Sequence, residues 1–288
     1  VICNPCAEFV NIPYTSCSLG SINLVKMLDG SKFNWERFGQ AIEDATKFIN
    51  NTIDLNHFPL EKIKNITLQT RPLGLGNMGL AHILFKKKIR YGSEKSILLT
   101  EEINKYATLK SMKTSVELAK ESGSYPAFDY DLFMKANERF FTKNCREINV
   151  SELAKEIKEH GIRNSSFTSV APTGSISFIA DVSSGMEPVF GLSYFRNIEK
   201  VTKDKESVFL IDPIFEQYLK DTYDETLQQE ILKQVAEDNG SCQQCTLIPQ
   251  EMRDVFVTAG DLTPMEHLEV LAAVANNVSL SVSKTINL

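Results

Sequence analysis

Residues 163–177 read Arg-Asn-Ser-Ser-Phe-Thr-Ser-Val-Ala-Pro-Thr-Gly-Ser-Ile-Ser. The run at 167–171 is apolar or β-branched without strict alternation, which is typical of a buried parallel strand. A turn rich in glycine and hydroxyl side chains follows directly. Backbone N–H groups and hydroxyls in such a turn can hold a phosphate without lysine or arginine. The stretch predicts a strand ending in a loop for a small anion; the alternative is an ordinary strand-to-helix connection.

The sequence predicts helices both before and after this strand. Apolar residues recur every three or four positions in several long segments, and Gly123 and the Thr263 capping box provide a stop and a start. The run at 278–282 again suits a buried strand. Helices are expected over 35–50, over 94–122, from the N-cap Asp212 towards Gly240 with a break, and from Thr263 through Val278. Strands separated by helices indicate an α/β protein with crossover connections.

Composition excludes several classes of protein. The chain has 288 residues, 42% of them hydrophobic, and 31 Lys and Arg against 37 Asp and Glu give a net charge of −6. This balance offers no broad basic face for nucleic acid. No apolar run approaches the roughly 20 residues that span a bilayer, so no membrane partner and a cytoplasmic location are expected. Six cysteines are too few for a disulfide framework, and are expected to be free, metal-bound or catalytic.

Three thiols lie close together near the start of the chain. Residues 3–8 read Cys-Asn-Pro-Cys-Ala-Glu, and Cys17 follows. If Asn4, Cys6 and Glu8 lie on an extended segment, the period of two places all three side chains on one side. One small site would then hold a sulfur, a hydrogen-bonding amide and a potential general base. The alternative is a buried free cysteine beside a turn-forming Asn-Pro pair.

The glycines Gly74, Gly76 and Gly79 formally match a dinucleotide-binding pattern, which would suit a nicotinamide-dependent oxidoreductase. That fingerprint needs an apolar strand before it. Residues 66–72 are instead polar and end in proline, which lacks a ladder donor. Close helix packing is therefore the favoured reading of these glycines.

Cys242 and Cys245 form a second C-x-x-C pair beside that of Cys3 and Cys6, nominally enough ligands for a structural zinc. This favours an alternative function, a zinc-stabilised nucleotide-binding or regulatory piece without catalysis. The two pairs lie at opposite ends of the chain, however, and compact zinc modules draw their ligands from nearby sequence. The four histidines show no metal-ligand spacing, so no metal site is predicted.

Together these segments resemble the catalytic subunit of ribonucleotide reductase, most closely its adenosylcobalamin-dependent class II. The Asn-Pro-Cys sequence and the spacing of 17 − 6 = 11 residues between two cysteines favour that class. The stretches occur in the family's order across the chain. They are Asn-Pro-Cys-Ala-Glu at 4–8, Cys-Ser-Leu-Gly-Ser-Ile-Asn-Leu at 17–24, Arg-Pro-Leu-Gly-Leu-Gly-Asn-Met-Gly-Leu at 71–80, Ala-Pro-Thr-Gly-Ser-Ile-Ser at 171–177 and Ser-Lys-Thr-Ile-Asn-Leu at 283–288.

The resemblance implies a ten-stranded α/β barrel of two five-stranded halves, of the ribonucleotide reductase and glycyl-radical type. A finger loop carrying the radical cysteine enters this barrel, and it corresponds to residues 1–24. Residues 1–288 would form the C-terminal half of the catalytic barrel domain. The N-terminal half is then expected to precede Val1, so the chain is interpreted as a fragment or a split subunit.

The resemblance also assigns roles to single residues. Cys6 would carry the thiyl radical that abstracts the ribose 3′ hydrogen, Glu8 would accept the 3′-hydroxyl proton, and Asn4 would hydrogen-bond near the departing 2′-hydroxyl. Cys17 would be one of two thiols that become oxidised to a disulfide, with its partner outside this chain. Cys3, Cys242 and Cys245 receive no role.

Phosphate binding would fall to the loop after the strand, formed by Pro172, Thr173, Gly174, Ser175, Ile176 and Ser177. The implied substrate is a ribonucleoside di- or triphosphate. The implied cofactor is adenosylcobalamin, or alternatively a radical supplied by a separate metal-containing subunit. Expected partners are the missing half, a thioredoxin-like or glutaredoxin-like reductant and, in a homodimer, a second copy.

Overall fold

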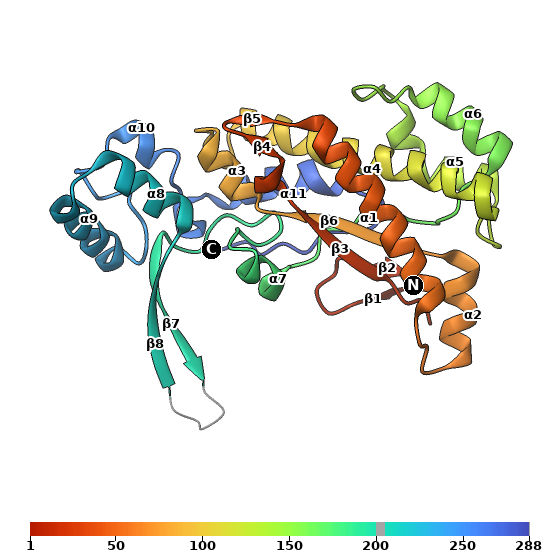
Figure 1. Cartoon of the computed structure of the whole chain (residues 1–288), viewed down its shortest axis with the longest axis horizontal. Coiled ribbons are helices and arrows are strands. Elements are labelled where there is room, and N and C mark those ends of the chain that lie inside the picture. Colours follow the sequence, from red (N-terminus) through yellow and green to blue (C-terminus); the bar gives the residue numbers. More distant parts are fainter. Residues whose placement is uncertain (200–204, 288) are drawn as a thin grey trace.

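The computed structural model describes residues 1–199 and 205–287, and it alternates helices with short strands (Figure 1). Residue 288, the last of the 283–288 motif, lies outside the described residues. The strands are β1 (Ile2–Cys3), β2 (Val10–Asn11), β3 (Ser18–Asn23), β4 (Leu28–Asp29), β5 (Lys32–Phe33), β6 (Leu73–Met78), β7 (Ser193–Glu199) and β8 (Lys205–Ile211). The α-helices are α1 (Trp35–Leu55), α2 (Glu61–Thr70), α3 (Leu80–Lys86), α4 (Glu94–Ser122), α5 (Tyr130–Asn137), α6 (Val150–His160), α7 (Gly174–Ile179), α8 (Pro213–Thr222), α9 (Glu225–Glu237), α10 (Gln250–Arg253) and α11 (Pro264–Ala275). Short 3-10 turns are η1 (Leu24–Met27), η2 (Glu138–Phe141) and η3 (Ala259–Asp261).

A parallel arrangement of four chain segments forms the centre of the fold. β3 pairs in parallel with β6, from Ser18 opposite Leu73 to Asn23 opposite Met78. Parallel bridges then join Leu75 to Thr168 and Val170 to Val282. The ladder continues through hydrogen bonds from Ser169 N to Leu75 O (3.1 Å) and from Val170 N to Ser281 O (3.2 Å). The expected parallel alignment at 167–171 and 278–282 is confirmed, although each segment pairs only through single bridges.

Two glycines of β6 allow this close packing. A Cβ on Gly76 would collide with the Ser169 carbonyl oxygen, and one on Gly74 would lie 3.0 Å from Cys17 Sγ and 3.4 Å from Ser169 Cβ. These neighbours belong to the segment around Ser169 and to the residue before β3, so the expectation of close helix packing was wrong for Gly74 and Gly76. The residues form a buried strand rather than a loop after one, which also removes the dinucleotide fingerprint. Gly79, by contrast, caps helix α3.

Two long helices, α1 and α4, pack together, and α1 also contacts β3 and β6 (Figure 1). The buried stripe of α1 includes Phe38, Ile42, Ile49 and Ile53. A buried hydrogen bond between the Thr46 and Ser111 hydroxyls (2.9 Å) joins α1 to α4. The sequence therefore predicted this amphipathic helix correctly, but it continues to Leu55 rather than ending near Asn50.

The other predicted helix boundaries are largely confirmed. α4 occupies the expected range and ends at Gly123. Asp212 caps α8, and the expected break before Gly240 falls between α8 and α9. The Thr263 capping box opens α11, but that helix ends at Ala275 rather than Val278. The helix ends there because the backbone N–H groups of Ser279 and Leu280 donate to Thr168 instead of to helical carbonyls. The residues that follow therefore run alongside the sheet.

Strands β7 and β8 form an antiparallel hairpin that projects away from the other elements (Figure 1). Among the described residues, no helix combines the length and the apolarity that crossing a membrane requires.

We expect Gly76→Ala to lower the free energy of unfolding by about 2 to 3 kcal/mol, because its Cβ meets a backbone oxygen that cannot turn aside. Gly260→Ala is the matched control, since a Cβ there meets nothing within 4 Å. Urea denaturation of the three proteins provides the comparison. Equal midpoints for Gly76→Ala and wild type would contradict the close approach of β6 to the 167–170 segment.

Candidate active site

The finger loop is a hairpin whose tip is a tight turn. β1 and β2 pair antiparallel, with Cys3 opposite Val10. The turn between them closes through Asn4 N to Phe9 O (3.2 Å), and Asn4 Oδ1 accepts a hydrogen bond from Phe9 N (3.0 Å). Ala7 adopts φ +65°. The expected extended conformation of residues 4–8 was therefore wrong, because the Asn-Pro pair and the Asn4 side chain favour a turn.

The side chains in this turn differ sharply in exposure. Cys6 is exposed, whereas Glu8 is only 4% exposed and Asn4 is half-buried. The Glu8 Oε2 atom is buried and accepts no hydrogen bond from the described residues. A buried carboxylate oxygen without a donor is costly, and a substrate hydroxyl would satisfy it.

The backbone of Glu8 fixes the finger loop to the sheet. Its carbonyl oxygen accepts hydrogen bonds from Ser169 Oγ (2.6 Å) and Ser281 N (3.2 Å). Both donors come from the parallel segments beyond β6. The loop is thus anchored at Glu8, while its tip at Cys6 faces solvent.

Cys17 lies directly before β3, where a Cβ on Gly74 would be 3.0 Å from its sulfur. Burial, and secondarily the negative charge of Glu8, raises the pKa of the Cys17 thiol to about 12. Ser169 links the two residues, because its Cβ and the Cys17 sulfur both lie within 3.4 Å of the Cβ position of Gly74, and its hydroxyl donates to the Glu8 carbonyl (2.6 Å). At neutral pH the thiol is held protonated, in the form that can donate a hydrogen atom.

The predicted phosphate loop lines a cavity of about 220 Å³ beside β3. Four of its six expected residues contribute to the wall: Thr173, Gly174, Ser175 and Ile176. They face the β3 residues Leu19, Gly20 and Ser21. Pro172 is exposed and does not line the cavity, and the Ser177 hydroxyl instead bonds Ser184 Oγ (2.8 Å).

Thr173 occupies a special position in this loop. It adopts the left-handed conformation, φ +56°, and is buried. Its Oγ1 accepts a hydrogen bond from Gly185 N (2.7 Å). A residue that follows α7 thus holds the Thr173 side chain of this loop in place.

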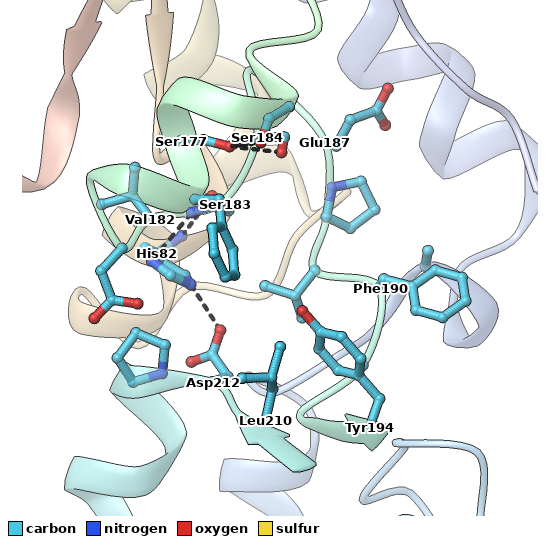
Figure 2. A pocket seen from close by; sticks show the side chains of 18 of the residues that line it. His82, Ser177, Val182, Ser183, Ser184, Glu187, Phe190, Tyr194, Leu210 and Asp212 are labelled. Atoms are coloured by element: carbon cyan, nitrogen blue, oxygen red, sulfur yellow. Dashed lines mark hydrogen bonds and ion pairs between the residues drawn. The ribbon is translucent and has the colours of Figure 1, made fainter. Parts of the chain in front are cut away.

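A second cavity, of about 480 Å³, borders a different face of α7 (Figure 2). His82 lies in its wall, with Nε2 2.7 Å from Asp212 Oδ2, and Nδ1 accepts a hydrogen bond from Ser183 N. Sequence reasoning treated the histidines as scattered and missed these buried pairs. The partners Ser183 and Asp212 lie 101 and 130 residues from His82, so no local pattern could have found them.

The two C-x-x-C pairs do not form a zinc site in the structure. Cys3 and Cys6 are exposed, while Cys242 and Cys245 are buried. Cys242 Sγ donates to Phe256 O (3.4 Å), and burial raises the pKa of this thiol to about 12. Within the described residues, no group of three or more His, Cys, Asp or Glu side chains is arranged to hold a metal ion. The zinc alternative therefore has no ligand set here.

We expect Cys3 and Cys6 to react with iodoacetamide first at pH 8, and Cys17 at least about a hundredfold more slowly. Cys17 is only partly exposed, and a pKa of about 12 leaves a thiolate fraction near 10⁻⁴ at this pH. Its rate should rise as the pH increases towards 12. Peptide mapping by mass spectrometry measures each site, with Cys6→Ala as the assignment control. If Cys17 were labelled as fast as Cys6, its restricted access and its raised pKa would both be contradicted.

Comparison with known proteins agrees with this geometry. A family model described as "Ribonucleotide reductase, barrel domain" matches residues 1–288. A vitamin B12-dependent ribonucleoside-diphosphate reductase of Thermoplasma acidophilum is 35% identical over 99% of this chain and 33% of its own length. A protein of the same name from Mycobacterium tuberculosis is 32% identical, over 99% of this chain and 37% of its own length. The chain thus spans about a third of these curated relatives.

A comparison with solved structures agrees on the fold. The α subunit of the Actinobacillus ureae class Id ribonucleotide reductase superposes with a TM-score of 0.67 and 22% identity. The match covers 92% of this chain and 42% of that one, so the four parallel segments and their helices are part of an α/β barrel. The chain belongs to the ribonucleotide reductase family and carries sequence of its barrel domain.

Proposed function

We propose that this chain supplies the finger loop and the substrate-binding part of a ribonucleotide reductase barrel, which replaces the ribose 2′-hydroxyl by hydrogen. The observation that carries the proposal is the buried Glu8 Oε2 without a hydrogen-bond donor, set beside the protonated Cys17. A carboxylate in this state can accept a hydroxyl proton, and a neighbouring thiol can supply reducing equivalents.

The proposed chemistry begins at Cys6, as a thiyl radical. An S–H bond forms as the ribose C3′–H bond breaks, and Glu8 accepts the 3′-hydroxyl proton. The 2′-hydroxyl leaves as water after protonation. Cys17 and a second thiol outside the described residues supply two electrons and two protons and become a disulfide, and Cys6 then returns the hydrogen to C3′. Overall, a ribonucleotide and a dithiol give a deoxyribonucleotide, a disulfide and water.

Asn4 would assist at the sugar. Its Oδ1 is engaged by Phe9 N, which fixes the orientation of the carboxamide. The amide N–H donors would then bond near the departing 2′-hydroxyl, where charge develops.

The substrate phosphates would lie in the 220 Å³ cavity formed by β3 and residues 171–176. Thr173 and Ser175 offer hydroxyls, and Gly174 and Ile176 offer backbone N–H groups. We propose that Pro172 shapes the entrance, and that Ser177 acts from behind the loop through Ser184. The substrate class is a ribonucleoside diphosphate or triphosphate, in keeping with the names of the relatives.

Adenosylcobalamin is the cofactor that we propose, since two of the most similar relatives are named vitamin B12-dependent. The Cys6 thiol is exposed at the hairpin tip, so a radical source outside this chain could reach it. When bound, the cofactor would supply the oxidising radical. The alternative source is a separate metal-containing subunit.

The sheet favours completion by a further polypeptide segment. Within the described residues, β3 pairs with β6 alone, so its other edge has no strand partner. An open parallel edge favours pairing with additional strands. We propose that the other half of the barrel occupies it, that a thioredoxin-like or glutaredoxin-like protein reduces the disulfide, and that the assembly is a homodimer in the cytoplasm.

We expect the chain, together with the other barrel half, to reduce CDP or CTP in the presence of adenosylcobalamin. Cys6→Ala should abolish the reaction, and Glu8→Gln should lower the rate by about 10²- to 10⁴-fold, the usual contribution of a general base. Glu237→Gln, at an exposed position of α9, is the control. Deoxynucleotide formation is measured by chromatography. Full activity of Cys6→Ala would refute the mechanism. Activity that requires a metal-containing subunit instead of adenosylcobalamin would show that the proposed cofactor is wrong.

We also expect co-expression with a first-half polypeptide to raise the soluble yield and the melting temperature of this chain, because the β3 edge becomes paired. Size-exclusion chromatography and thermal unfolding measure both. A chain that is equally soluble and monomeric by itself would contradict the half-barrel interpretation.

A further inference from the structure

Two stretches of the sequence have no task in the proposed chemistry, and the structure brings them together. One is Ser-Ser-Gly-Met-Glu-Pro at 183–188, and the other begins at Ser283. Glu187 Oε2 accepts from Lys284 Nζ (2.6 Å), and Oε1 accepts from Thr285 N (2.8 Å). Both carboxylate oxygens are therefore used to join the loop after α7 to the segment that follows the last parallel bridge.

Lys284 is buried, and its ammonium group is fully hydrogen-bonded within the protein. Its side chain is 1% exposed, and its Nζ also donates to His267 Nδ1 (2.9 Å) and to the Thr285 carbonyl. His267 Nε2 donates to Ala259 O (3.2 Å), so its Nδ1 is left as an acceptor. Burial, together with Lys284, lowers the pKa of His267, which is consistent with a neutral ring. A buried cation held in this way is a structural clamp rather than a ligand for substrate.

The loop has further anchors at its other end. Ser183 N donates to His82 Nδ1 (3.2 Å), and Gly79 N donates to Ser183 O (2.8 Å). Figure 2 shows His82 lying between Ser183 and Asp212. Tyr91 donates its hydroxyl to Met186 O (2.7 Å). The loop is thus fixed to α3, to the N-cap of α8 and to the C-terminal segment.

From this fixed position the loop contacts the phosphate loop twice. Gly185 N donates to Thr173 Oγ1 (2.7 Å), and Ser184 Oγ bonds Ser177 Oγ (2.8 Å). Gly185 has φ +46°, and a Cβ there would lie 3.0 Å from Ala171 O. No larger residue fits without moving the two loops apart.

We propose that residues 183–187, which we call the bracket, position the phosphate loop, and that Glu187 and Lys284 are positioning residues for substrate binding. The Gly185 N–H occupies one lone-pair direction of Thr173 Oγ1. The hydroxyl hydrogen of Thr173 is thereby directed away from the bracket, so it can be donated to a phosphate oxygen in the cavity. This last step rests on the proposed function, whereas the bracket itself rests on contacts in the structure.

Glu187 is the sensitive point of the bracket. Removing its charge leaves Lys284 buried without an ionic partner, which is unfavourable enough to move the segment. A small displacement of Gly185 would release the Thr173 hydroxyl from its fixed orientation. Binding geometry of this kind is lost through shifts of about 1 Å.

The test is Glu187→Gln, which keeps the size of the side chain, with Glu216→Gln as control, because Glu216 forms an exposed ion pair with Lys220 (2.7 Å). Hydrogen exchange should become about tenfold faster for amides 174–187 in Glu187→Gln only, while β6 amides keep their protection. The affinity for CDP should fall about tenfold, and the weak affinity for cytidine should not change. In a Thr173→Val background, Glu187→Gln should cause no further loss of CDP affinity.

Unchanged exchange in Glu187→Gln would overturn the bracket. Faster exchange with unchanged CDP affinity, or full additivity with Thr173→Val, would overturn its role in positioning the substrate. If the wild-type chain, paired with the other barrel half, does not bind CDP, the proposed function is refuted instead. The exchange rates still show whether Glu187 holds the bracket in place. If Glu187→Gln does not fold, the combination with Lys284→Met removes the buried cation and repeats the same comparison.

Discussion

The close approach of β6 to the 167–170 segment is the constraint on which the rest of the structure depends. Gly76 faces the Ser169 carbonyl, and Gly74 leaves room for Cys17 and for the Ser169 side chain. Because these positions lack a Cβ, the parallel segments lie at hydrogen-bonding distance. Ser169 Oγ then donates a hydrogen bond to the carbonyl of Glu8, and this bond fixes the finger loop against the sheet. The catalytic carboxylate that we propose is thus held in place by Ser169, on a segment that pairs with β6.

The site has two levels of support. The finger loop is held by Ser169 and Ser281, and the phosphate loop is held from behind by the bracket. Both supports use residues from the C-terminal segment, Ser281 for the first and Lys284 for the second. One short stretch of chain thus couples the position of the proposed general base to that of the hydroxyls that we propose bind phosphate. Such coupling of rigid supports is what the precise placement of a reactive sugar requires.

Local pattern was sufficient for much of this architecture. The periodicity of α4 and the capping box of α11 predicted these helices correctly, because helix signals are contained in a few neighbouring residues. The conformation of residues 4–8 was not, since the Asn4 side chain competes with extended structure through a contact to Phe9. The role of the glycines in β6 and the Glu187–Lys284 pair depend on segments more than 50 residues apart. Sequence spacing cannot disclose such contacts.

The central claim is that Glu8 and the loop at 173–176 bind opposite ends of one ribonucleotide. A structure of the chain with its complementary barrel half and bound CDP tests this most directly. The account predicts the 3′-hydroxyl within hydrogen-bond distance of Glu8 Oε2, and the phosphates against the Thr173 hydroxyl and the Gly174 and Ser175 amides. A nucleotide bound elsewhere, with Glu8 Oε2 still unpartnered, would contradict it.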